Sequence, residues 1–219
     1  MADHAQDGLL REIDEELRQE HYAKLWKLYG NYIIAAALAL VVGVAGFQVW
    51  RERDTKARTA NSEAYTLAER LVRQGKPDEA AAAFAALAAD ANRGYALLSR
   101  FQEAAVRASQ DRTQEAAAIY REIAADTSVP ENYRNGAIVL GAFQELDTVD
   151  PSLLITRVSP LLAGDVPWRH SAREITGLAA FRAGDVDKAR DAFRALSQDA
   201  TAPAAVRARA SEMLAILEN

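Results

Sequence analysis

The sequence predicts an all-α protein: one transmembrane helix, then an α-solenoid of stacked helix pairs, then a C-terminal capping helix. Three observations lead to this prediction. A run of 23 uncharged residues stands near the amino end, alanine is abundant while glycine accounts for only 11 of 219 residues, and three later ten-residue pieces align without gaps. Alanine loses no side-chain entropy in a helix. Because no segment alternates apolar and polar residues with the period of a half-buried strand, we expect no sheet.

The uncharged run at residues 28–50, LYGNYIIAAALALVVGVAGFQVW, is the predicted transmembrane helix. It would be roughly 34 Å long as a helix, against a hydrocarbon core of about 30 Å. Aromatic residues, which settle at headgroup level, gather at both edges of the run: Trp26, Tyr29 and Tyr32 at one edge, Phe47 and Trp50 at the other. A cleaved signal peptide and a buried soluble helix are the alternatives. The run is longer than a signal core and 27 residues precede it, so a retained anchor is favoured.

Residues 1–27 form an acidic tail that we expect to be partly helical and cytoplasmic, with four Lys and Arg residues against seven Asp and Glu residues. The cations flanking the apolar run do not decide its orientation, because they are almost evenly divided. On the amino side they are Arg18, Lys24 and Lys27, and on the carboxyl side Arg51, Arg53, Lys56 and Arg58.

Small residues recur along one side of the predicted transmembrane helix. Ala35, Ala39, Gly43 and Gly46 follow one another at four-, four- and three-residue steps. Such a stripe lets another helix approach closely within a bilayer, so we predict a contact stripe for a partner span. The alternative is that alanine is abundant throughout this chain and that membrane helices are enriched in glycine.

The segment after the apolar run contains an internal repeat. The three aligned pieces are GKPDEAAAAF from Gly75, DRTQEAAAIY from Asp111 and GDVDKARDAF from Gly184. Each begins with a turn and starts a helix. One face of that helix carries a small residue, an aromatic four residues later and a branched aliphatic three after that. The offsets of 36 and 73 residues leave room for a fourth, degenerate copy near DTVDPSLLITRV, from Asp147. A period of this length indicates stacked supersecondary units.

Helix start and stop signals complete the units. A charged juxtamembrane segment and the first repeat helix occupy residues 51–74, the repeats occupy 75–202, and a capping helix occupies 203–219. The predicted pairs are 54–74 with 77–89, 92–109 with 112–125, 130–146 with 151–162, and 167–183 with 185–197. The capping helix has one apolar face, as the end of a stack requires.

The first helices of the pairs are expected to line a concave surface. Basic and aromatic residues on these helices suit a peptide or a partner helix. For each of them the alternative is an ordinary solvated or core position. The candidates for a partner-binding groove are Arg100, Arg107, Tyr133, Arg134, Trp168 and Arg173.

The sequence offers little for catalysis. It has no cysteine, which excludes disulfides and thiolate chemistry, and its three histidines stand apart. His170 and Glu174 share a helical face, but no second motif supports a site there. No phosphate-binding loop or nucleophile motif occurs. We therefore expect no enzyme activity, no metal and no cofactor. Residues 51–219, with 22 Lys and Arg against 24 Asp and Glu, give no electrostatic reason to expect nucleic acid.

The helix pairs, with small residues where the two helices touch and an aromatic further along the second helix, resemble the tetratricopeptide repeat. Over the whole chain, REIDEELR, KLWKLYGNYII, RERDTKAR, AGDVDKARDAF and APAAVRARASEMLAIL resemble the bacterial tetratricopeptide-like membrane proteins related to the ancillary subunit of the Sec translocon. This resemblance implies a single span in the inner membrane, with the amino end cytoplasmic and the repeats periplasmic.

Two functions follow as expectations. The first is a membrane-anchored protein-interaction module at the Sec translocon, linking it to periplasmic chaperones or emerging secretory chains. Tethering such a module raises its local concentration without any new contact. The alternative is a structural or assembly subunit of another inner-membrane complex, bound mainly through its transmembrane helix.

Overall fold

The computed structural model describes the backbone of residues 3–164 and 166–218 and, within these ranges, the side chains of residues 24, 26–32, 34–36, 38–164 and 166–218. The described backbone consists of helices and short connections without a strand, as the all-α prediction requires. The chain divides into two compact units, Met1–Lys56 and Ala57–Asn219.

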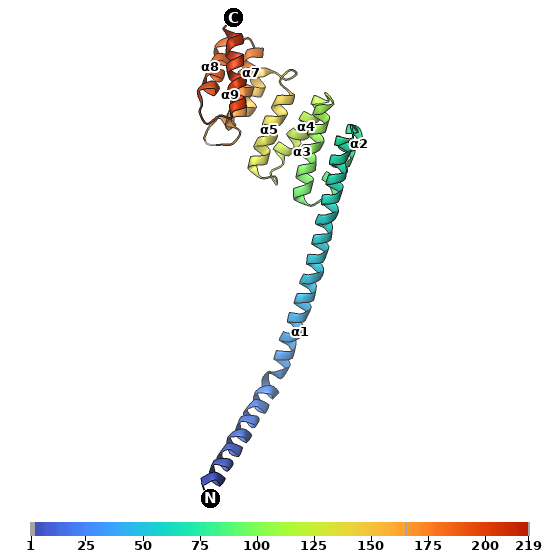
Figure 1. Cartoon of the computed structure of the whole chain (residues 1–219), viewed down its shortest axis with the longest axis vertical. Coiled ribbons are helices and arrows are strands. Elements are labelled where there is room, and N and C mark those ends of the chain that lie inside the picture. Colours follow the sequence, from blue (N-terminus) through green and yellow to red (C-terminus); the bar gives the residue numbers. More distant parts are fainter. Residues whose placement is uncertain (1–2, 165, 219) are drawn as a thin grey trace. The chain divides into compact units, whose positions relative to one another are not determined.

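The first helix, α1 (Asp3–Arg73), contains the apolar run (Figure 1). The tail, the apolar run and the first repeat helix join into one helix, since no proline stands among these residues to interrupt it. Among the described residues, Trp26–Arg73 is the helical stretch that is long and apolar enough to cross a membrane. Its most apolar window has no buried residue.

The second unit is built of short helices, each of which packs on the next along the chain from α2 to α9 (Figure 1). The end of α1 packs on α2 through Tyr65 and Phe84, whose ring centroids are 5.4 Å apart. The bounds are α2 Pro77–Asp90, α3 Arg93–Ser109, α4 Thr113–Ala125, α5 Glu131–Gln144, α6 Pro151–Val158, a 3-10 turn η1 Ser159–Leu162, α7 Arg169–Arg182, α8 Val186–Gln198 and α9 Ala204–Leu217.

From α2 onward these bounds agree with the sequence-based prediction to within a few residues, apart from one change of helix type. The helix expected over 151–162 ends at Val158 and continues as η1. Pro160 has no N–H to bond the carbonyl of Thr156, and the hydroxyl of Ser159 donates to that carbonyl instead, at 2.9 Å. The helix expected from residue 167 begins at Arg169.

The three aligned pieces each begin with a residue of left-handed backbone conformation. The φ angles are +71° at Gly75, +59° at Asp111 and +78° at Gly184. Glycine adopts this conformation at no steric cost, and aspartate tolerates it better than most residues. The predicted turns are therefore confirmed.

The core follows the repeat pattern. The marker alanines Ala80, Ala116 and Ala189 are fully buried, and the aromatics four residues later, Phe84, Tyr120 and Phe193, are at most 4% exposed. Twelve residues before each marker the preceding helix carries a small residue, where the second helix of the pair approaches closely. At Gly177 an added Cβ would lie 2.8 Å from the ring of Phe193.

The fourth copy lies on α6 and η1, in a register that the sequence did not reveal. Leu154, Val158 and Leu161 are buried with the same four- and three-residue steps as the other copies. Twelve residues before Leu154 stands the fully buried Ala142. Aliphatic residues replace both the alanine and the aromatic, so the copy has the repeat geometry without its composition.

Candidate protein-binding groove

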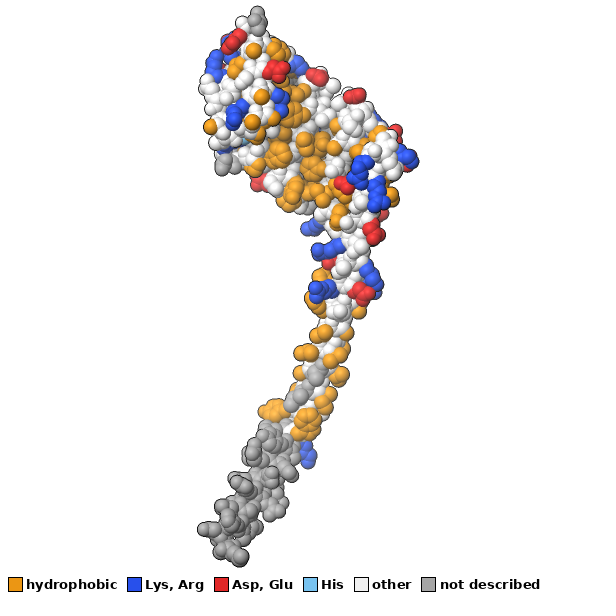
Figure 2. Space-filling model, in the orientation of Figure 1, with side chains coloured by type: hydrophobic (Ala, Val, Ile, Leu, Met, Phe, Trp, Pro, Cys, Tyr) orange, Lys and Arg blue, Asp and Glu red, His pale blue; other side chains and the backbone are white. Residues whose placement is uncertain are grey.

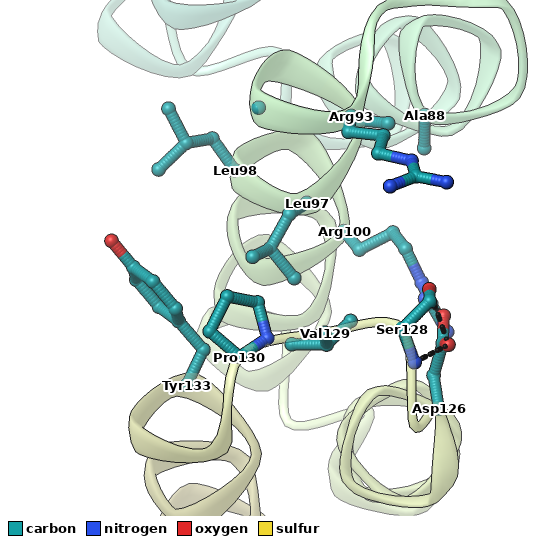
Figure 3. A pocket seen from close by; sticks show the side chains of 12 residues that line it. Ala88, Arg93, Leu97, Leu98, Arg100, Asp126, Ser128, Val129, Pro130 and Tyr133 are labelled. Carbon is teal, nitrogen blue, oxygen red and sulfur yellow. Dashed lines mark hydrogen bonds and ion pairs between the residues drawn. The ribbon is translucent and has the colours of Figure 1, made fainter.

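An apolar groove opens beside α3 in the second unit. It has a volume of about 590 Å³, which is within the usual range of ligand pockets. Leu97 and Leu98 of α3, Val129 and Pro130 of the α4–α5 connection, and Tyr133 of α5 form its apolar wall (Figure 3). Hydrophobic side chains also gather on the face of the unit that carries α3 and α5 (Figure 2). The remaining lining residues are Ala88, Arg93, Gly94, Ala96, Arg100, Asp126 and Ser128.

The two ends of the groove differ in polarity. Leu98 and Tyr133 lie at one end, and Arg93, Arg100 and Asp126 lie toward the other (Figure 3). Leu98 is 47% exposed and Tyr133 45% exposed. Solvent-exposed apolar side chains of this size, gathered around a hollow, are typical of surfaces that bind a partner.

The two arginines of the groove are in different electrostatic situations. Arg100 is partly buried and lies 3.5 Å from a carboxylate oxygen of Asp126 and 3.6 Å from one of Glu122. Arg93 is exposed and forms no ion pair with any residue that the structure describes. The pKa of Asp126 is lowered, first because the Ser128 hydroxyl and N–H donate to its carboxylate and then because of Arg100. Asp126 is therefore occupied, and Arg93 is the cation left for a ligand.

Of the six residues proposed from the sequence for a partner-binding groove, Arg100 and Tyr133 line this one. Arg107 and Arg173 are held by acidic residues of the same unit. Arg107 lies 3.9 Å from Asp78 and 3.7 Å from Glu115, and Arg173 lies 3.7 Å from Asp199.

Trp168 and Arg134 also lie outside this groove. The indole Nε1 of Trp168 donates to the carbonyl of Asn132 at 2.9 Å, and the ring packs on Gly136, where an added Cβ would lie 2.7 Å from it. The Nε of Arg134 is buried and has no hydrogen-bond partner among the described residues. Trp168 thus fills the space between α5 and α7 with a side chain of the unit itself.

Comparison with known proteins identifies the architecture. The profile of the tetratricopeptide repeat-like domain matches residues 23–138, which is more than half of the chain. The chain belongs to the tetratricopeptide repeat-like domain family. No curated protein and no solved structure matches it. A tetratricopeptide repeat-like domain is a protein-interaction fold, which agrees with an exposed apolar groove between first helices.

This tetratricopeptide repeat-like domain contains a second repeated motif, which lies outside the three aligned ten-residue pieces. DTSVP at residues 126–130 and DATAP at residues 199–203 share an aspartate, a hydroxyl residue and a proline at the same spacing, 73 residues apart. In both, the carboxylate accepts from the backbone N–H two residues later, at 3.0 Å from Ser128 and 2.9 Å from Thr201. Each aspartate also pairs with an arginine of the preceding first helix, Arg100 or Arg173.

His170, which shares a helical face with Glu174, is close to Asp199. The distance from its Nδ1 to the Asp199 carboxylate is 3.5 Å. Glu174 is nearly buried and accepts two hydrogen bonds from Arg209 of α9, at 2.6 and 2.9 Å. Where side chains are described, no three His, Cys, Asp or Glu residues gather as potential metal ligands. The side chains of His4 and His21 lie outside the described residues.

The four residues of the predicted transmembrane stripe, Ala35, Ala39, Gly43 and Gly46, are all exposed. An added Cβ at Gly43 or Gly46 would meet no other described atom within 4 Å. A role for the stripe in contacting another span stays a prediction.

Proposed function

We propose that the protein is a membrane-anchored protein-interaction module of the bacterial envelope, acting as an accessory factor at the Sec translocon. It would hold periplasmic chaperones or emerging secretory chains beside the translocon. The observation that carries the proposal is the open groove beside α3, on a tetratricopeptide repeat-like domain, in a chain that also contains a helix apolar enough to span a membrane.

The groove supports an interaction function because Leu98, Pro130 and Tyr133 of its apolar wall are exposed to solvent. In the proposed arrangement the helix pairs stack as an α-solenoid, the first helices share one surface, and the anchor occupies residues 28–50. The amino end lies in the cytoplasm and the repeats lie in the periplasm. An anchor confines the groove to the membrane surface, which raises its effective concentration toward any partner at the same membrane.

The test is affinity purification of the full-length protein from bacterial membranes after mild crosslinking. We expect translocon subunits together with periplasmic folding factors. The matched control is the same chain with Leu98→Asp and Tyr133→Asp, which places charges on the apolar wall and should retain the translocon while losing the chaperones or secretory chains. Recovery of neither group by the unaltered chain would contradict the proposal.

The second candidate is a structural or assembly subunit of another inner-membrane complex, bound mainly through the apolar helix. The exposed stripe of small residues favours it, because alanine and glycine let a second helix approach. Ala39→Leu with Gly43→Leu keeps the helix hydrophobic but fills the stripe. If this double variant loses every membrane partner while the charged groove variant loses none, the second candidate replaces the first.

A further inference from the structure

The groove beside α3 has a filled counterpart in the same domain. The first helices can be aligned on the buried small residue that each of them carries, and positions are then counted back from it. This residue is Ala104 on α3, Ala142 on α5 and Gly177 on α7. Nine residues before these stand Tyr95, Tyr133 and Trp168. The first helices α3, α5 and α7 therefore each have an aromatic at the same place, within the helix or directly before it.

Two of these aromatics fill the junction between their own first helix and the first helix of the preceding pair. Trp168 lies on Gly136 of α5 and donates its indole N–H to the carbonyl of Asn132. Tyr95 lies against Tyr65 of α1, with ring centroids 5.9 Å apart. At each of these two junctions a side chain of the protein covers the preceding first helix.

The third aromatic leaves its junction open. The residues on α3 that correspond to Gly136 and Asn132 are Leu98 and Gly94, and both line the groove. Gly136 has no side chain, so the indole of Trp168 packs directly on α5. The side chain of Leu98 occupies the corresponding place on α3, so the ring of Tyr133 cannot pack on α3 in the same way. Tyr133 remains 45% exposed, and the two side chains stand apart at the end of the groove (Figure 3).

We propose that the groove between α3 and α5 receives one large aromatic side chain from a partner segment, which completes this junction as Trp168 completes the next. A carboxylate near that aromatic in the partner segment would form an ion pair with Arg93. The inference rests on the proposed function of the domain as a protein-interaction module, and it specifies the chemistry of the segment that is bound.

The charges around the groove favour a partner segment that has an acidic residue near its aromatic. Asp126, the other charged lining residue besides Arg93 and Arg100, is engaged by Ser128 and Arg100. Arg93 forms no ion pair with the described residues, so a bound carboxylate would gain a charge-assisted hydrogen bond without displacing another group. A basic segment would gain no such contact. A volume of about 590 Å³ leaves room for one aromatic ring together with the backbone that carries it.

The experiment uses the full-length chain in lipid nanodiscs and a phage-displayed library of random short peptides. The best peptide is then synthesised with its aromatic changed to serine and, separately, with its acidic residue changed to the amide. Its affinity is measured for the unaltered chain, for Arg93→Gln, and for Leu98→Gly with Tyr133→Trp. That double variant copies the pair at Gly136 and Trp168 and should fill the groove. Leu67→Gly, an exposed leucine outside the groove, controls for glycine in a helix, and circular dichroism controls for folding.

We expect the selected peptides to share an aromatic with a nearby Asp or Glu. Loss of the aromatic, or filling of the groove, should weaken binding by about tenfold or more, as for an anchor residue in a pocket. Arg93→Gln should weaken binding of the acidic peptide by about fivefold and leave its amide analogue unchanged. Selection of peptides without an aromatic, or equal binding by the folded double variant, overturns the inference.

Failure of this inference can be told from failure of the proposed function. If the groove-filled chain still recovers both translocon subunits and periplasmic factors from membranes, the proposed function stands and the groove is not where partners bind. If the groove binds aromatic acidic peptides while the unaltered chain recovers no envelope factors, the inference stands and the proposed function fails.

Discussion

Glu145 is the clearest example of a single residue on which neighbouring helices depend. Its side chain is 4% exposed at the end of α5, and its two carboxylate oxygens accept from Arg121 of α4 and Arg157 of α6. A buried carboxylate is tolerated only where cations and hydrogen bonds replace its water. This residue therefore links the second helix of one pair to both helices of the next.

Glu145→Gln should lower the free energy of unfolding by about 2–4 kcal/mol, because it removes the charge that holds the partly buried Arg157. Asp187→Asn is the matched control, since Asp187 pairs with Arg190 while its own side chain is 93% exposed. That change should cost less than about 1 kcal/mol. Denaturant unfolding of the full-length chain in detergent, followed by circular dichroism, measures both. Similar losses for the two variants would show that Glu145 does not join the helices.

Gly177→Ala sets two effects against each other. Alanine favours the helix by about 1 kcal/mol over glycine, but the added Cβ would lie 2.8 Å from the ring of the buried Phe193. Overpacking of this kind costs roughly 1–3 kcal/mol, so we expect a net loss of stability. Gly94→Ala, where the nearest atom would be 3.5 Å away, should not destabilise. A rise in Tm for Gly177→Ala would mean that Phe193 can move.

At the scale of elements, aspartates stabilise two of the connections that follow a second helix, α4–α5 and α8–α9. Asp126 and Asp199 each bond the hydroxyl residue two positions later, and each faces an arginine of the first helix. The pKa of each is lowered, first by the hydrogen bond from the Ser128 or Thr201 hydroxyl and then by the backbone N–H of the same residue. The ionised carboxylate is the form that the fold favours.

Acid should therefore loosen these connections. A lowered folded-state pKa stabilises the fold above the ordinary aspartate value of 3.8, and this stabilisation is lost as the pH falls through the lower folded-state pKa. Asp126→Asn with Asp199→Asn should lower Tm at neutral pH and make Tm fall less steeply below about pH 3.8. Thermal unfolding at stepped pH measures this. Parallel Tm profiles for the two chains would exclude the aspartates as the cause.

The last helix should be needed for the stability of the one before it. α9 covers Phe193 and Leu196 with Val206 and Ala210, and Arg209 pairs with the nearly buried Glu174. Removal of residues 203–219 should expose this apolar face and leave Glu174 unpaired, so amide hydrogens of α8 should exchange much faster. Arg209→Gln removes only the ion pair and should have a smaller effect. Unchanged exchange in α8 after truncation would argue against a capping role.

The sequence predicted the helices of the second unit well because turn residues, prolines and the spacing of apolar residues are local signals. It placed the fourth copy only approximately, since Leu154 and Val158 keep the repeat geometry with other residue types. It also grouped the arginines together as groove residues. Arg100 and Arg173 each pair with an aspartate of the turn 26 residues further on, and no pattern within one helix reveals such a pairing.

The open groove itself could not be read from the pattern. Leu98 lines the groove at the position where α5 has Gly136, on which Trp168 packs. That difference becomes visible only after the first helices are aligned on their buried small residues. Arg93 was not among the residues predicted for a groove, and the structure places it in the lining.

At the scale of the whole molecule, the proposed topology makes a direct prediction. A reporter enzyme that is active only in the periplasm, fused after residue 219, should be active, and the same reporter fused before residue 1 should be silent. The mature protein should retain its amino-terminal residues, which mass spectrometry of the intact chain measures. A cytoplasmic carboxyl end would contradict the proposed location of the groove.

Trp168 has a spectroscopic consequence. It is the one tryptophan of residues 57–219, and the other two, Trp26 and Trp50, flank the apolar run. In a vesicle, lipids with brominated acyl chains would quench the fluorescence of Trp26 and Trp50. The remaining fluorescence would come from Trp168, which packs between α5 and α7. A ligand or force that separates α5 from α7 would expose this indole to water and shift its emission maximum to longer wavelength. The separation could then be followed without a label attached to the protein.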